Sequence, residues 1–333
     1  MNIVREVVSN LELGQPQTHL NLTFFPLTSA GQGEGGLEYL VLGKALDAGL
    51  ARVREVSRRG SVPELLLDNM ADLPVLVLDG EELVGAKQNR IANLTVMAPP
   101  KAKTVIPVSC VEAGRWGHTT SEFAVADRAC FALARAAKAR HVSASLRDCG
   151  NRLSDQGGVW ADIAAKAERL DCLSPTQAMS EVFERHRGRI DSYVSAFSTT
   201  DEQHGALFAI DGRIAGLDLF DRADTLSALF AKLVRSYAAD AFETADQSPL
   251  SADPKAARAF VDRLATATAE RYPAVGLGTD IRITSDGVSA GGLVVDDSLV
   301  HLAAFADTEP DASSAGSRGF ASFRARRRAR DEF

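Results

Sequence analysis

The sequence predicts an α+β protein that begins with an antiparallel, β-sandwich-like sheet, continues with helices, and ends with a hairpin, helices and a strand meander. Three observations predict this class. Short apolar runs divided by turn residues fill the N-terminal third, Ala-rich segments with helical spacing follow from about residue 121, and short apolar runs return near the end. The order differs from the βαβ alternation of parallel sheets. We expect a β-rich domain over 1–120, an α+β part over 121–306 packed against it, and a basic tail over 307–333.

The N-terminal third contains the first set of predicted strands. "ARVREVS" alternates with period two, and "VPELLLDN" and "LPVLVLDG" are short apolar runs that end at Asn or at Asp-Gly. Strands with this spacing predict a β-sandwich or a barrel-like sheet. One short helix is expected within "GLEYLVLGKALDAGL".

The middle of the chain is predicted to be helical. "FALARAAKARHVSASLRDCG" and "GVWADIAAKAERLDCL" are Ala-rich, with Arg and Lys on the presumed solvent face. A third helix is expected to begin at "SPTQAM", with Ser174 as N-cap and Pro175 in the first turn. Asp211-Gly212 then predicts a hairpin.

The last part of the chain is predicted to hold two more helices and a closing meander. We expect one helix after Asp224, which would serve as its cap, and another over residues 253–272. The meander has turns expected at residues 286–287 and 296–297.

Composition and charge exclude several classes of protein. The 333 residues are 45% hydrophobic with a net charge of −7, which argues against a surface made for nucleic acid. The arginine-rich segment 313–333 is the exception, and we expect it to be disordered, to be dispensable for folding and to suit an acidic partner. Neither a signal peptide nor an 18-residue apolar span is indicated, so a cytoplasmic location without membrane contact is expected.

The four cysteines and six histidines lack metal-binding spacing. No CxxC or HxxxH occurs, so we predict reduced, mostly buried thiols and no metal site. Cys110 with His118 as its base is a nucleophile hypothesis, although a cysteine within a strand is more often part of a core.

The stretch "LDGEELVGAKQNRIANLTVMAPPKAKTVIPVSCVEAGRW", residues 78–116, is unusually dense in functional side chains. Amides can bind the polar edges of a base or ribose, arginines can fork onto phosphate, and tryptophan offers a stacking face. Glu82 and Glu112 are the candidate acid and base. The predicted ligand-binding residues are Lys87, Gln88, Asn89, Arg90, Asn93, Arg115 and Trp116.

The same block has a purely structural interpretation, in which its charges pair with one another in a solvated turn. Under the binding hypothesis we expect the two polar segments to converge in space, because they flank strands of one sheet. The residues concerned are Gln88, Asn89, Arg90, Glu112 and Arg115.

Several blocks resemble one family. "GAKQNR", "PVSCVEAGRW", "QGGVW" and "HGALFAIDGRIAGLDLF" are similar to the domain family named for its association with ADP-ribosylglycohydrolase and rhodanese-phosphatase superfamily proteins. The resemblance covers most of residues 15–305. It implies an intracellular, bacterial-type protein whose relatives are linked by association to NAD and ADP-ribose metabolism, and it implies no particular reaction.

Two functions therefore stand side by side. The first is binding or processing of a phosphate-bearing, nucleotide-like metabolite related to ADP-ribose or NAD. The alternative is a noncatalytic assembly or adaptor protein, such as a homo-oligomer, in which the polar block forms an interface. The sequence identifies no cofactor and leaves open whether the protein is an enzyme.

Overall fold

A computed structural model describes residues 3–29, 36–117, 119–172, 174–245, 251–285 and 287–307. It confirms the predicted α+β class, because helices pack against antiparallel sheets. The basic tail and His118 lie outside the described residues. Among the helices of the described part, none combines the length and the apolar character needed to cross a membrane.

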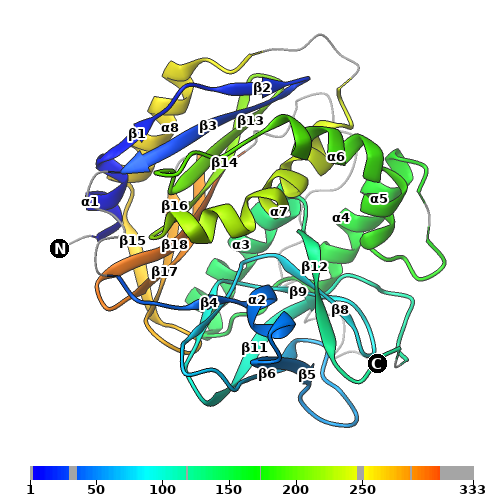
Figure 1. Cartoon of the computed structure of the whole chain (residues 1–333). Coiled ribbons are helices and arrows are strands. Elements are labelled where there is room, and N and C mark those ends of the chain that lie inside the picture. The colour runs from blue at the N-terminus through cyan, green and yellow to red at the C-terminus, as the bar shows by residue number, and fades with distance from the viewer. Residues whose placement is uncertain are drawn as a thin grey trace, which may run out of the picture.

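One large antiparallel sheet forms the upper part of the molecule in Figure 1. Its strand order is β1-β3-β13-β14-β18-β17-β16-β15, and β2 pairs with β3. The strands are β1 (Leu11–Leu13), β2 (Gln17–His19), β3 (Leu22–Ser29), β13 (Gly205–Ile210), β14 (Arg213–Phe220), β15 (Ala269–Pro273), β16 (Thr279–Ser285), β17 (Val288–Val295) and β18 (Ser298–Ala306).

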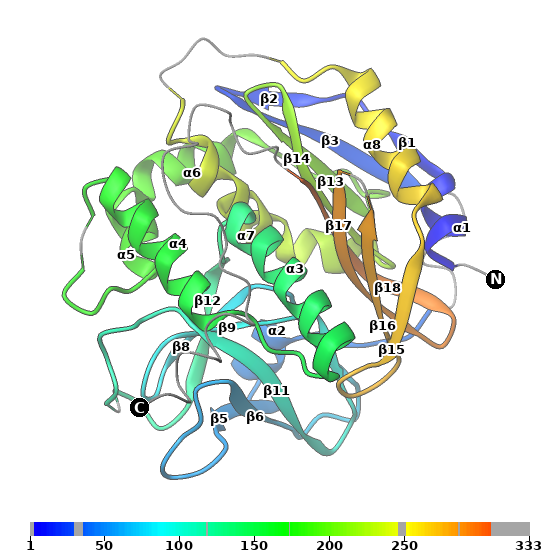
Figure 2. The ribbon, with the colours of Figure 1, turned by 180° about the vertical axis from the view of Figure 1, so that it is seen from behind.

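Helices cover both faces of this sheet, as Figure 2 shows from behind. Side chains alternate between faces along a strand, so Phe24 of β3 joins the core beneath α3 (Ala132–Cys149) and α7 (Ala223–Ala241). Its neighbour Phe25 joins the core beneath α1 (Ile3–Ser9) and α8 (Pro254–Thr266). The continuous apolar run of β3 is thus explained by burial on both sides.

A closed barrel forms the lower part of Figure 1, with the order β11-β6-β5-β12-β8-β9. Of the two arrangements predicted for these strands, the structure has the barrel. Beside it lie a three-stranded sheet of β10, β7 and β4, and the short helix α2. The bounds are β4 (Leu40–Val41), α2 (Leu42–Asp47), β5 (Ala51–Glu55), β6 (Glu64–Asn69), β7 (Val75–Val77), β8 (Glu81–Gly85), β9 (Arg90–Ala92), β10 (Val96–Ala98), β11 (Ala102–Cys110) and β12 (Phe123–Ala129).

Three further helices, α4 (Gln156–Arg169), α5 (Ser180–Arg185) and α6 (Arg187–Ala196), follow α3 in the chain. The predicted helix start at Ser174 is wrong. Gln177 has a left-handed φ of 52°, and Ala178 forms a β-bridge with Glu112, so the helix begins only at Ser180. Ser174 Oγ instead accepts hydrogen bonds from the backbone N–H groups of Thr176 and Ala178.

Other boundaries also differ from prediction. The helix expected over 253–272 ends at Thr266, because residues 269–273 pair with β16 as strand β15. Asp224 lies in the first turn of α7, and Arg222 holds the N-cap position without a side-chain cap hydrogen bond. The short helix α1 was not predicted from the sequence.

The N-terminal strands do not pair with the strands of the barrel that follows them. β3 pairs with β13, so residues 11–29 extend the large sheet, and the barrel lies between β3 and β13 along the chain. The division of the chain at residue 120 stays a prediction.

Candidate functional site

Polar side chains occupy one end of the barrel interior. Alternation along β5, β9 and β11 turns Val53, Ala92 and Val108 into the apolar barrel core. The next inward positions toward this end are Glu55, Arg90 and Cys110, and the last two are register partners. We call this end the mouth, and it is where small barrels bind ligands. The mouth cluster comprises Glu55, Lys87, Gln88, Arg90, Cys110 and Trp116.

Two cations lie over one exposed aromatic ring at the mouth. The guanidinium carbon of Arg90 is 5.8 Å and the Lys87 ammonium 4.9 Å from the ring centre of Trp116, which is 51% exposed. Arg90 is fully buried and donates from Nε to the carbonyl of Val62 at 3.1 Å. Burial lowers the pKa of Arg90, while the nearby Cys110 and Glu55 oppose that shift. An aromatic ring next to two cations suits a ligand that has both a planar ring and an anionic group. The planar ring can stack on the tryptophan, and the anionic group can bind the cations.

Several buried atoms of the mouth cluster have no hydrogen-bond partner within the described part of the chain. They are Arg90 Nη2, Gln88 Oε1 and both carboxylate oxygens of Glu55. Buried polar atoms are nearly always paired, because an unpaired one loses its bonds to water without replacement. Four such atoms belong to the mouth cluster, which makes it the candidate binding site.

Cys110 connects the mouth to α4. The side chain of Gln156 forms two 2.8 Å hydrogen bonds with the backbone of Cys110, accepting from its N–H and donating to its carbonyl. Burial raises the pKa of the Cys110 thiol, and hydrogen bonds from the Glu112 backbone and the Trp160 side chain act against this. A protonated thiol is a weak nucleophile. The chain's two tryptophans, Trp116 and Trp160, therefore flank the Arg90–Cys110 pair.

The predicted convergence of the two polar segments is observed. Asn89 N–H donates to Glu112 Oε2 at 3.1 Å, Gln88 Nε2 donates to the Glu112 carbonyl, and Arg115 pairs with Glu112 at 2.6 Å. Arg115 also donates to Asn89 Oδ1 and to the carbonyls of Gly85 and Ala86. The Arg115 and Asn89 bonds lower the pKa of Glu112 against the effect of burial. This bonding supports a structural role for Asn89, Glu112 and Arg115, and their binding or catalytic roles stay predictions.

Two predicted residues point away from the mouth. Asn93 donates to the Arg152 carbonyl and accepts from Ser109, so both polar ends of its amide are hydrogen-bonded. Glu82 lies on the outer face of β8, where Arg128 Nε donates to its Oε2 at 2.5 Å. Burial raises the pKa of Glu82, with Arg128 opposing. Glu82 and Glu112 thus differ in environment, as acid–base pairs do, but Glu82 lies outside the mouth.

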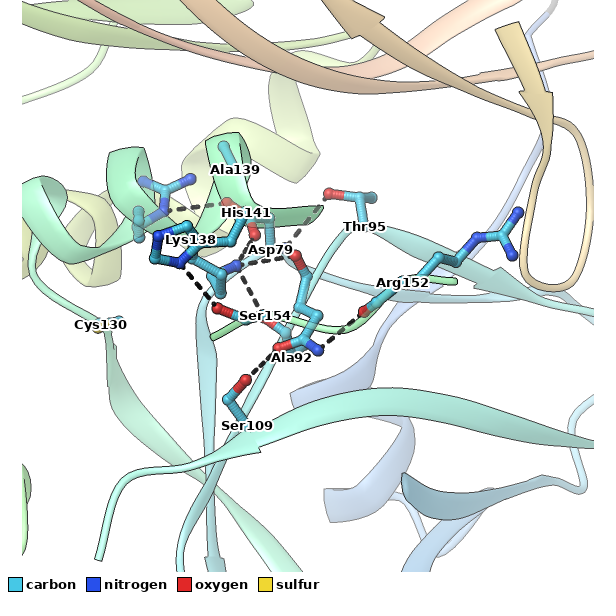
Figure 3. A network of polar contacts seen from close by, with 12 residues as sticks. Asp79, Ala92, Thr95, Ser109, Cys130, Lys138, Ala139, His141, Arg152 and Ser154 are labelled. Atoms are coloured by element: carbon cyan, nitrogen blue, oxygen red, sulfur yellow. Dashed lines mark hydrogen bonds and ion pairs between the residues drawn. The ribbon is translucent and has the colours of Figure 1, made fainter. Parts of the chain in front are cut away.

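A second polar cluster, which we call the central ion network, joins the barrel to α3 and the large sheet. Lys138 of α3 binds the Asp79 carboxylate and the carbonyl of Ala92, as Figure 3 shows. It also donates to the carbonyl of Asn93. Arg135 makes two hydrogen bonds, of 2.6 and 3.1 Å, to Asp218 of β14. The network comprises Asp79, Thr95, Arg135, Lys138, Asp218, Tyr237 and His301.

The carboxylate of Asp218 is kept ionised by its partners in the central ion network. Burial alone would raise the pKa of Asp218, but the charge of Arg135 and the bond from His301 hold it well below its usual range. Gly80, at φ 77°, leaves room for Arg135, because a Cβ there would lie 3.0 Å from Arg135 Cγ. The adjoining hollow, lined by Asp79, Thr95 and Arg282 among others, has space of about 10 Å³, roughly that of one water molecule. We therefore interpret the central ion network as a structural connection between the barrel, α3 and the large sheet.

Sequence reasoning missed Glu55 and the central ion network. Glu55 could have been found from "ARVREVS", where a carboxylate continues the inward series of Ala51 and Val53. The ion network had no local signal, because its members are spread from residue 79 to residue 301. Among the described residues, no group of three or more His, Cys, Asp or Glu side chains could hold a metal ion.

One comparison with known proteins gives a match. The family model described as the ARG and Rhodanese-Phosphatase-superfamily-associated Protein domain, ARPP-1, matches residues 10–305. No curated protein and no solved structure matches the chain at a significant level.

Proposed function

The chain belongs to the ARPP-1 domain family, and from this premise we propose that the barrel mouth binds a phosphate-bearing, nucleotide-like metabolite of the ADP-ribose or NAD class. The observation that carries the proposal is Arg90, whose buried Nη2 edge has no partner within the described residues. A guanidinium edge forks onto phosphate oxygens with charge-assisted hydrogen bonds. Lys87 adds a second cation beside it.

The remaining groups of the mouth support a ligand with a planar base. Trp116 presents an exposed indole face, and Gln88 Oε1 is an unused acceptor for an amino group or hydroxyl. A bound phosphate would satisfy Arg90, while Asn89, Glu112 and Arg115 keep the loop in place through their mutual bonds. Binding residues and supporting residues are thus separate sets within one short stretch.

Titration with ADP-ribose, NAD and ADP tests the proposal, because both tryptophans lie at the mouth and their fluorescence reports on it. We expect a change in emission and a rise in melting temperature for at least one ligand, about 2.7 kcal/mol of stabilisation at a hundredfold excess over Kd. Lys87→Ala and Arg90→Lys should weaken binding at least tenfold. Lys103→Ala removes an exposed cation from the same barrel and serves as the matched control.

A noncatalytic assembly role is the second candidate, favoured by the exposure of Trp116 and Trp160. Exposed tryptophans are enriched in protein interfaces. If none of the nucleotides binds, and Trp116→Ala changes the mass measured by analytical ultracentrifugation, the assembly role replaces the ligand-binding role.

A further inference from the structure

Glu55 is the one acidic side chain of the mouth cluster. It is the last inward residue of β5 and is 9% exposed, and both of its carboxylate oxygens lack a hydrogen-bond partner within the described residues. A buried carboxylate without hydrogen bonds is unfavourable, so such groups are normally paired. Glu55 thus needs an explanation other than stability.

The neighbouring cations do not satisfy Glu55. The Lys87 ammonium donates to the carbonyl of Arg59, and Arg90 donates from Nε and Nη1 to the carbonyls of Val62 and Asn89. No ion pair joins Glu55 to a described residue, although Glu55 is near enough to oppose the lowering of the Arg90 pKa by burial. The mouth therefore presents a carboxylate and a guanidinium edge that are close together, and each has unused hydrogen-bonding capacity.

Gly60 lies close against Glu55 and the stem of Lys87. A Cβ at residue 60 would lie 3.1 Å from Glu55 Oε2 and 3.1 Å from Lys87 Cδ, and the φ of 78° also favours glycine there. The turn after β5 thus passes over the carboxylate and the lysine stem without a side chain. A larger residue at position 60 would press on the carboxylate, so the glycine lets this turn lie against Glu55.

We infer that Glu55 recognises the vicinal hydroxyls of a ribose, which makes the ligand of the mouth a ribosyl phosphate rather than a simple phosphate or pyrophosphate. A carboxylate with two free oxygens accepts from two adjacent hydroxyls, the contact that an acidic residue makes to ribose in dinucleotide sites. Arg90 and Lys87 take the phosphate, and Trp116 takes the base. The inference rests on the proposed function of the same site.

Three probes separate the ribose contact from the phosphate contact: ADP, 2′-deoxy-ADP and inorganic pyrophosphate, each measured by titration calorimetry. The wild-type protein should bind ADP about 10- to 100-fold more tightly than 2′-deoxy-ADP, because a hydrogen bond to a charged carboxylate is lost. Glu55→Gln should lower ADP affinity to the level of 2′-deoxy-ADP. Its pyrophosphate affinity should be unchanged or higher, because a negative charge has been removed.

The controls assign each result. Glu64→Gln changes an exposed carboxylate of the same barrel and should leave all three affinities as in the wild type. Equal wild-type affinity for ADP and 2′-deoxy-ADP would overturn the ribose contact while leaving phosphate binding intact. Equal losses for ADP and pyrophosphate in Glu55→Gln would show that Glu55 only shapes the mouth, which also overturns the inference. If no probe binds the wild type, the proposed function fails and the inference fails with it.

Discussion

The central ion network and the mouth cluster are both groups of buried charged side chains, yet they differ in how their hydrogen bonds are used. In the network, Arg135 and Lys138 each bond to an opposite charge. At the mouth, Glu55 and Arg90 are also buried, but each has polar atoms without a hydrogen-bond partner within the described residues. Burial of charge alone therefore does not identify a binding site. Under the proposed function, the difference between the two regions is that several neighbouring polar atoms of the mouth cluster have no hydrogen-bond partner within the described residues.

The largest expected effect is the loss of Asp218 from the network. Asp218→Ala removes the carboxylate that accepts two hydrogen bonds from the buried Arg135 and leaves the longer ion pair to Asp79, at 3.4 Å. Removing one partner of a buried pair costs about 3–5 kcal/mol of unfolding free energy. Urea denaturation followed by circular dichroism measures this. The control is Asp224→Ala, which removes a 63% exposed partner of Arg222 and should cost about 0–1 kcal/mol. A loss below about 1 kcal/mol for Asp218→Ala would remove the contrast between the two regions.

Asp221 lies between the two cases, because Oδ1 accepts from Tyr39 at 2.5 Å while Oδ2 has no partner in the described part. Burial raises its pKa from 3.8 to about 6, with the Tyr39 bond opposing. The folded protein thus holds this proton more tightly than the unfolded chain. The resulting stability is complete below pH 3.8 and is lost as pH rises through about 6, by up to about 3 kcal/mol.

Urea melts between pH 4 and pH 8 test this for the wild type and Asp221→Asn. The difference between the two proteins should change with pH in the stated direction, because other titrating groups, such as His204, are common to both. Parallel stability curves would show that Asp221 titrates at its ordinary pKa.

Arg115 is expected to have a structural role, as the residues of the central ion network do, rather than to bind the ligand. It bonds to Glu112, to Asn89 and to the carbonyls of Gly85 and Ala86. Arg115→Ala leaves these acceptors unsatisfied, so we expect a loss of about 2–3 kcal/mol in urea denaturation. If stability is unchanged while nucleotide binding is lost, Arg115 contacts the ligand directly.

Gln88 and Arg90 should show the smallest effect on stability. Each makes bonds to backbone carbonyls but keeps one unused polar atom, so Gln88→Ala and Arg90→Ala should each cost less than about 2 kcal/mol. The same substitutions should abolish ligand binding, because they remove the groups proposed to contact the ligand. A small effect on stability is expected because binding residues are poorly optimised for stability. Losses above about 2 kcal/mol in both would assign them to the scaffold and would end the binding hypothesis.

Local patterns predicted much of the fold. Period-two alternation located β5, Asp211-Gly212 located the β13–β14 hairpin, and Ala-rich spacing located α3 and α4. The failures came from contacts between distant segments. Residues 269–273 carry a helical pattern but pair with β16, and Ala178 is held by Glu112 rather than by a helix. Tertiary pairing outweighs local propensity in such places.

The candidate site was predictable in part for the same reason. The density of polar residues over 81–116 located the loop at the mouth and the convergence of its two segments. Which side chains support the loop and which stay unpaired depends on β5 and β11, whose registers the sequence does not reveal. Glu55 was missed because its importance arises only from where the barrel closes.

The pairing of β3 with β13 has a consequence for how the chain is made. Phe24 lies opposite Phe208, so 184 residues (208 − 24) separate the partners, and the whole barrel is synthesised between them. At about 5–20 residues per second, roughly 10–40 s pass before β13 leaves the ribosome. During that time the barrel can fold, while strand β3, which is apolar on both faces, has no large sheet to join. Nascent β3 is therefore the segment for which a chaperone that holds extended apolar peptides would matter most.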